Sequence, residues 1–113
     1  MKKKNSISFI FPVYNEENRL KFLFKNIINY EKKNNFNEYI FVNDGSTDNS
    51  LNLLKKFTNR NKKKFQVISY FKNMGKGHAL KMGMRIAKKK WILTLDTDLS
   101  VKLNQINFWF KKY

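Results

Sequence analysis

The chain has 113 residues, enough for one folded domain with a buried hydrophobic core. It contains no cysteine and a single histidine, which excludes a disulfide framework, a thiolate metal site and any multi-histidine site. Basic residues outnumber acidic ones by 24 to 8, giving a net charge of +16, and no apolar run approaches the ~20 residues of a membrane-spanning helix.

The positive charge has two interpretations. It could attract an anionic partner, such as nucleic acid, an acidic membrane surface or a phosphorylated substrate. It could also reflect codon usage, because nearly all the basic residues are lysines and Asn, Ile and Phe are abundant as well. We favour codon usage, since the lysines are scattered and form no arginine-rich recognition stripe. The few acidic residues are therefore the more informative ones.

The chain begins with a segment that predicts a strand followed by a helix. Residues 6–12 (SISFIFP) are apolar, β-branched or aromatic and end at a proline, which is typical of a buried strand. Their apolar part is too short for a signal peptide. Residues 17–30 follow with apolar side chains at helical spacing, which predicts a helix whose buried face carries Leu20, Leu23, Phe24, Ile27 and Ile28.

The same alternation continues along the rest of the chain. Residues 38–43 (EYIFVN), 65–70 (FQVISY) and 91–95 (WILTL) predict three more buried strands. Between them we expect a helix with Thr47 or Asp48 as its N-cap and an apolar face of Leu51, Leu54 and Phe57. Residues 76–88 predict a third helix, with an apolar side of Leu80, Gly83, Met84 and Ala87. A last helix is expected from Leu103, Ile106 and Phe110.

Four strands that alternate with four helices predict an α/β fold with a mainly parallel four-stranded sheet and flanking helices. We expect one domain over residues 1–113. Ligands of such sheets bind beyond the carboxyl ends of the strands, so the acidic residues that follow the strands should meet at one edge. These are Glu16, Asp44, Asp96 and Asp98.

Each of these acidic groups has a structural alternative. Asp44 either caps the next element or holds a ligand, and its place on the binding edge favours the ligand. Asp96 and Asp98 together offer two hard oxygen donors, which suit Mg²⁺ or Mn²⁺. Otherwise one of the pair caps a turn and the other is solvated.

The segment KNMGKG, residues 72–77, matches neither of the common glycine-rich phosphate loops. Gly75 and Gly77 can nevertheless let the backbone approach a ligand at a helix start, with Lys76 nearby. A tight loop before a helix explains the same residues equally well.

Taken together, FPVYNEE, VNDGSTDNS, KNMGKGHALKMG and DTDLS, in this order and spacing, resemble the Rossmann-like nucleotide-sugar-binding half of family 2 glycosyltransferases with the GT-A fold. The resemblance covers residues 6–100. KGHALKMGM followed by DTDLS is most similar to the polyprenyl-phosphate (dolichyl-phosphate) glucosyltransferases.

The resemblance implies a role for each site residue. Asp44 would accept a hydrogen bond from the uracil N3–H, and Asp98 would hold Mg²⁺ or Mn²⁺ on the diphosphate. The residues implied to contact the nucleotide-sugar are Pro12, Tyr14, Glu16, Asp44, Lys76 and Asp96. The implied activity is transfer from a UDP-sugar, UDP-glucose in particular, to an acceptor such as polyprenyl phosphate.

The relatives continue well past the D-x-D and carry their acceptor site and catalytic base there. We therefore expect a truncated, donor-binding half with an unassigned catalytic base, located in the cytoplasm or peripherally at a membrane. Its last helix would leave an apolar patch for self-association or a second polypeptide. The alternatives are a non-catalytic nucleotide-sugar-binding subunit that needs a second chain, and a lysine-rich nucleic-acid binder.

Overall fold

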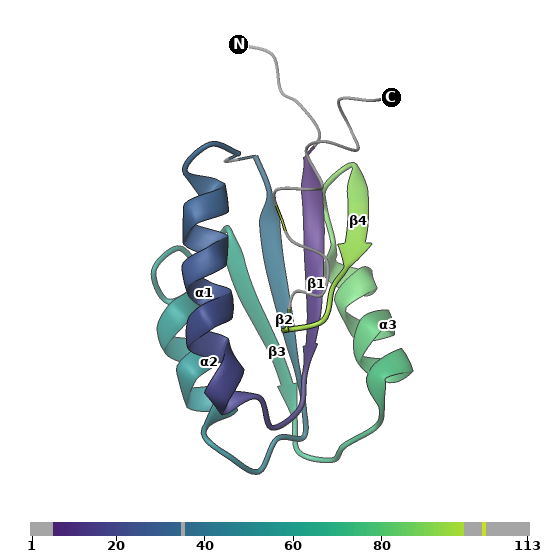
Figure 1. The fold of residues 1–113 in the computed structure, drawn as a ribbon. Coiled ribbons are helices and arrows are strands. Elements are labelled where there is room, and N and C mark those ends of the chain that lie inside the picture. Colours follow the sequence, from purple (N-terminus) through teal and green to yellow (C-terminus); the bar gives the residue numbers. More distant parts are fainter. Residues whose placement is uncertain (1–5, 35, 99–102, 104–113) are drawn as a thin grey trace.

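The computed structural model describes residues 6–34, 36–98 and 103. They form a parallel sheet of four strands in the order β3-β2-β1-β4, with helices on both faces (Figure 1). This confirms the predicted α/β fold. The elements are β1 (Ile7–Val13), α1 (Glu17–Glu31), β2 (Glu38–Asp44), α2 (Ser50–Thr58), β3 (Phe65–Tyr70), α3 (Lys76–Ile86) and β4 (Trp91–Thr94).

The strand order reverses beside β1. The chain runs outward from β1 through β2 to β3, with α1 and α2 on one face of the sheet (Figure 1). Helix α3 then crosses the other face, and β4 pairs with the free side of β1, where Ile10 aligns with Thr94. In open α/β sheets the crevice at such a reversal is where ligands bind.

Two apolar layers hold the helices on the sheet. On the side of α1 and α2 the core is aromatic, and the rings of Phe24 and Phe57 stack with centroids 4.1 Å apart. On the other side α3 packs Ala79 against Ile10, Ile40 and Val42. Because both faces of β1 and β2 are covered, these strands are almost wholly buried.

Gly83 lets α3 lie close to the sheet. A Cβ atom at this position would be 2.5 Å from Cγ2 of Ile10, so any larger residue would push the helix outward. Since α3 begins at the carboxyl edge of the sheet, its depth on the sheet also sets the position of Lys76.

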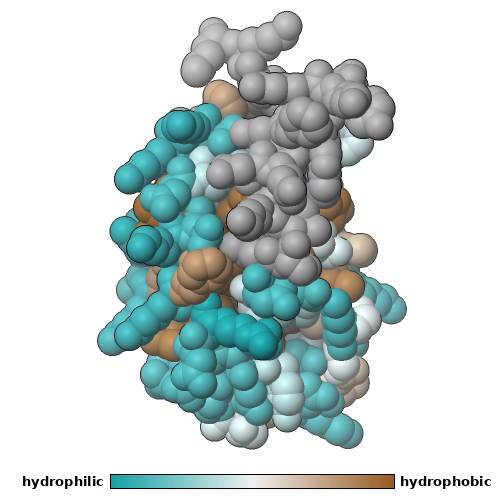
Figure 2. All heavy atoms as spheres, in the orientation of Figure 1, coloured by the Kyte–Doolittle hydropathy of each residue, from teal (hydrophilic) through white to brown (hydrophobic). Residues whose placement is uncertain are grey.

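Hydrophilic side chains cover most of the surface around the edge at which the strands end, at the bottom of Figure 2. Among the described helices, none has the length and the apolar character needed to cross a membrane.

The strand and helix boundaries agree with the sequence predictions to within two residues, apart from α2. That helix begins at Ser50 and its N-cap is Asn49, so neither Thr47 nor Asp48 is the N-cap, although the Asp48 carboxylate accepts the Ser50 N–H at 2.9 Å. The predicted final helix lies outside the described residues except for Leu103, which is buried.

Three burial predictions are wrong. Strand β3 lies at one edge of the described sheet, and only Phe65 in it is buried. Strand β4 is not buried, because it lies at the edge of the described sheet and leaves Trp91 and Ile92 each 45% exposed. Met84 points away from the sheet and is 48% exposed, while Met82 packs against the α3 side of the core in its place. In all three cases the apolar pattern did not reveal which side chains the neighbouring elements would cover.

Candidate functional site

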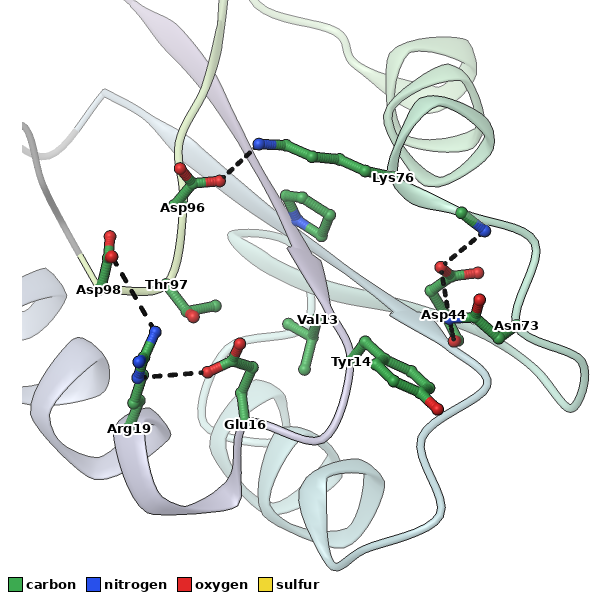
Figure 3. A pocket seen from close by; sticks show the side chains of 12 residues that line it. Val13, Tyr14, Glu16, Arg19, Asp44, Asn73, Lys76, Asp96, Thr97 and Asp98 are labelled. Carbon is green, nitrogen blue, oxygen red and sulfur yellow. Dashed lines mark hydrogen bonds and ion pairs between the residues drawn. The ribbon is translucent and has the colours of Figure 1, made fainter.

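The carboxyl ends of the strands surround one pocket of about 390 Å³. The residues singled out from the sequence all line it, namely Pro12, Tyr14, Glu16, Asp44, Lys76, Asp96 and Asp98. In Figure 3, Tyr14 and Asp44 lie on one side of the pocket, and Asp96 and Asp98 lie on the other. The sequence analysis did not single out as site residues Val13, Arg19, Asn73 or Thr97, which complete the lining with Gly75.

The Asp44 carboxylate anchors the loop between β3 and α3. Oδ1 accepts the N–H of Met74 at 2.8 Å, and Oδ2 accepts the N–H of Gly75 and the side-chain amide of Asn73, both at 3.0 Å. Asp44 is only 4% exposed, and an ionised carboxylate at such a position needs compensating donors. The loop supplies them, so the end of β2 and the start of α3 are held together.

Two glycines make this contact possible. Gly45 has φ of +74°, and a Cβ atom on it would be 2.4 Å from the backbone nitrogen of Asn73. Gly75 has φ of +98° and precedes the first residue of α3. Side chains at either position would disturb the approach of the loop to the strand end.

A half-buried tyrosine, Tyr70, has its hydroxyl next to this carboxylate. Burial raises the pKa of Tyr70, and the neighbouring Asp44 carboxylate raises it further. The Tyr70 ring packs edge-on against His78, with centroids 5.3 Å apart, and its hydroxyl makes no hydrogen bond within the described structure. Tyr70 therefore stays protonated beneath Asp44.

The loops after β1 and β2 are hydrogen-bonded to each other through Asn15. Its Oδ1 accepts the N–H groups of Thr47 and Asp48, at 2.7 and 3.2 Å, and its own N–H donates to Oγ of Ser46 at 2.9 Å. Asn15 has φ of 51°, a left-handed conformation that asparagine tolerates better than most residues. These bonds fix Tyr14 and Glu16 on either side of Asn15.

Asp48 strengthens the same junction from the other loop. Its carboxylate accepts the N–H of Ser50 at 2.9 Å and that of Glu17 at 3.3 Å, the first residues of α2 and α1. Burial alone would raise the pKa of Asp48, but the hydrogen bonds from Ser50 and Glu17 outweigh burial and lower it. The negative charge of Asp48 is also stabilised by the partial positive charge at the N-termini of the two helices.

The acidic side of the pocket is partly neutralised by the chain itself. Nζ of Lys76 lies 2.8 Å from Oδ1 of Asp96, and the two side chains are more than half exposed. The guanidinium of Arg19 lies 3.6 Å from Glu16 and 3.9 Å from Asp98 (Figure 3). Because exposed pairs of this kind contribute little to stability, both cations are free to rearrange around an anionic ligand.

A divalent cation fits this side of the pocket. Residues 6–34 and 36–98 contain no cluster of three or more potential ligands that would hold a metal by themselves. Mg²⁺ and Mn²⁺ need only one or two carboxylates when water and phosphate oxygens complete the coordination. The half-exposed carboxylates of Asp96 and Asp98 match that requirement.

The sequence matches the family described as Glycosyl transferase family 2 over residues 8–107. The chain belongs to this family. It is 36% identical over 104 residues to a dolichyl-phosphate β-glucosyltransferase of Trichomonas vaginalis, covering 87% of this chain and 32% of the relative. It is 34% identical over 97 residues to a poly-β-1,6-N-acetyl-D-glucosamine synthase of Staphylococcus aureus, covering 84% of this chain and 22% of that protein.

Solved structures of longer proteins share the fold. S. aureus TarS 1–349 in complex with UDP-GlcNAc superposes with a TM-score of 0.76 at 24% identity, over 95% of this chain and 31% of that one. A mannosyltransferase from Pyrobaculum calidifontis in complex with GDP-Man and Mn²⁺ superposes with a TM-score of 0.72 at 22% identity. The match covers 81% of this chain and 27% of the mannosyltransferase. The two structures that share this fold were solved with different nucleotide-sugars, UDP-GlcNAc in TarS and GDP-Man in the mannosyltransferase.

We predict that Asn15→Ala destabilises the protein by about 2 kcal/mol, because the substitution removes two accepted hydrogen bonds and strains a left-handed residue. Asn15→Asp keeps the acceptor oxygen and the tolerance of that conformation, so it should cost much less. Urea denaturation of both variants measures the difference. An equal loss of unfolding free energy in Asn15→Ala and Asn15→Asp would show that the hydrogen bonds of Asn15 do not hold the two loops together.

Proposed function

We propose that this chain binds a UDP-sugar donor in the pocket at the carboxyl ends of its strands, and that UDP-glucose is that donor. The observation that carries the proposal is the buried Asp44 carboxylate, which lines the pocket and retains capacity to accept a hydrogen bond. The pocket volume lies within the ~300–1,000 Å³ typical of sites for small ligands.

The nucleoside occupies the Asp44 side of the pocket in this proposal. Asp44 accepts the N3–H of uracil, and the half-exposed Tyr14 ring supplies a flat apolar surface for the base. Pro12 and Glu16 border the same space, and Lys76 faces the phosphates from the start of α3. The UDP-GlcNAc complex of TarS, a protein with the same fold, supports a uridine nucleotide.

The diphosphate occupies the acidic side. Asp98 would hold Mg²⁺ or Mn²⁺, and Asp96 would lie by the ribose or the sugar. When bound, the cation supplies charge stabilisation for the departing diphosphate. Lys76 and Arg19 add positive charge from the chain itself, and they can leave Asp96, Asp98 and Glu16 for the phosphate oxygens.

The acceptor we propose is a lipid phosphate such as polyprenyl phosphate, reached by peripheral contact with a membrane. This follows from the similarity to a dolichyl-phosphate β-glucosyltransferase. The chain spans 32% of that relative, so we place the acceptor site and the catalytic base outside the described residues. A further segment or a second polypeptide would then complete the enzyme, and the 113 residues by themselves would bind donor without transferring sugar.

Asp44→Asn tests the base contact. The substitution removes the negative charge of the acceptor, and it places an amide group beside the N–H donors that the Asp44 carboxylate satisfies in the wild type. The affinity for UDP should therefore fall by at least about tenfold, equivalent to ~1.4 kcal/mol. ADP binding, which we expect to be weak in the wild type, should hardly change. Calorimetry with both nucleotides decides it. Equal UDP affinity in the two proteins would leave Asp44 with the loop as its only role.

Asp98→Ala and Asp96→Ala test the metal assignment as a matched pair. Asp98→Ala should abolish the Mn²⁺ dependence of UDP-sugar binding, because a hard oxygen ligand is lost. Asp96→Ala should weaken binding more than it alters metal dependence. Titrations with Mn²⁺ at two salt concentrations measure both effects. The same Mn²⁺ dependence in both variants as in the wild type would contradict the assignment. Binding that weakens steeply as salt is raised, and that Asp44→Asn does not change, would favour a nucleic-acid ligand.

A further inference from the structure

The loop donors use up most of the accepting capacity of Asp44. An ionised carboxylate offers about four lone-pair positions, two on each oxygen. Oδ2 is filled, because the Gly75 N–H and the Asn73 amide both donate to it at 3.0 Å. Oδ1 accepts only the Met74 N–H, at 2.8 Å. One acceptor position therefore remains, and it is on Oδ1.

Among the described residues, no other group donates to that position within hydrogen-bonding geometry. The buried Tyr70 hydroxyl lies close enough to the Asp44 carboxylate to interact with it, but no described atom meets hydrogen-bonding distance and angle with that hydroxyl. The ion pairs of the described residues join cations to Glu16, Glu31, Asp96 and Asp98, and none involves Asp44. A ligand that enters the pocket thus meets a carboxylate able to accept one hydrogen bond.

Nucleobases differ in what they present to such a group. Uracil presents one N–H, at N3, between two carbonyl oxygens. Guanine presents two adjacent donors, N1–H and the N2 amino group, and pairs best with a carboxylate whose two oxygens are both free. Cytosine and adenine present a ring nitrogen lone pair, which a carboxylate repels. A single free acceptor fits uracil, and leaves one guanine donor without a partner.

We infer that Asn73 determines the nucleobase selectivity of this site by occupying Oδ2 of Asp44. Its amide nitrogen donates to Oδ2 and also to the backbone carbonyl oxygen of Asp44, both at 3.0 Å, which locks the carboxylate in one orientation. Asn73 is a positioning residue, because it acts on the base through Asp44. The inference rests on the proposed function, since it assumes that the pocket receives the nucleotide of a sugar donor.

The selectivity is tested first on the wild-type chain, by calorimetry with UDP, GDP and 3-methyl-UDP in the presence of Mn²⁺. UDP should bind at least about tenfold more tightly than GDP, the cost of one unpaired donor. The affinity for 3-methyl-UDP, which lacks the N3–H, should be lower than that for UDP by at least the same factor. Binding of neither UDP nor GDP would overturn the proposed function and this inference together. Equal binding of UDP and GDP would overturn only the inference.

The role of Asn73 is then isolated with Asn73→Ala. The Met74 and Gly75 backbone bonds to Asp44 do not depend on this side chain, so the loop keeps two of its three anchors on the carboxylate. The variant frees a position on Oδ2, so the preference for UDP over GDP should narrow by about tenfold. The control is Lys72→Ala, an exposed neighbour in the same loop that is not among the hydrogen-bond donors to Asp44, and it should keep the wild-type ratio.

A purely structural role for Asn73 gives a different result. In that case Asn73→Ala weakens UDP and GDP by the same factor and leaves their ratio unchanged, which would overturn the inference. Thermal denaturation of both variants, compared with the wild type, confirms that the ratio is measured on folded protein.

Discussion

A buried carboxylate at the end of a central strand, that of Asp44, is the group on which the arrangement of this site depends. An ion so little exposed is costly unless donors surround it, and the donors come from a loop that is 29 to 31 residues further along the chain. Satisfying this charge therefore fixes where the loop lies and where α3 begins. The position of Lys76, and of its contact with Asp96, follows from that start.

The sheet order brings the remaining groups to the same place. Strand β1 is paired on both sides, by β2 and by β4, so the loops that follow these three strands converge. Asn15 and Asp48 join the first two loops by hydrogen bonds in both directions. The result is a pocket with a buried, anchored carboxylate on one side and solvent-exposed ion pairs on the other. That division suits a ligand with a rigid base and a charged diphosphate.

Much of this could be predicted from the sequence. Apolar periodicity located the strands and helices, and the rule that ligands bind beyond parallel strand ends predicted that Asp44, Asp96 and Asp98 meet at one edge of the sheet. What the pattern could not supply was contact between distant segments. Asn73 and Arg19 look like ordinary polar surface residues in the sequence, and their importance comes from the carboxylates that they meet. The exposure of Trp91 likewise depends on strand order, which the local sequence does not encode.

The central claim is that the free acceptor of Asp44 reads the base while the loop keeps its anchors. A crystal structure of the chain with UDP and Mn²⁺ tests it most directly. The account predicts Oδ1 of Asp44 within hydrogen-bonding distance of uracil N3, with the Met74 and Gly75 N–H bonds to the carboxylate unchanged. A uracil ring bound elsewhere in the pocket, or a loop released from Asp44 to admit it, would contradict the account.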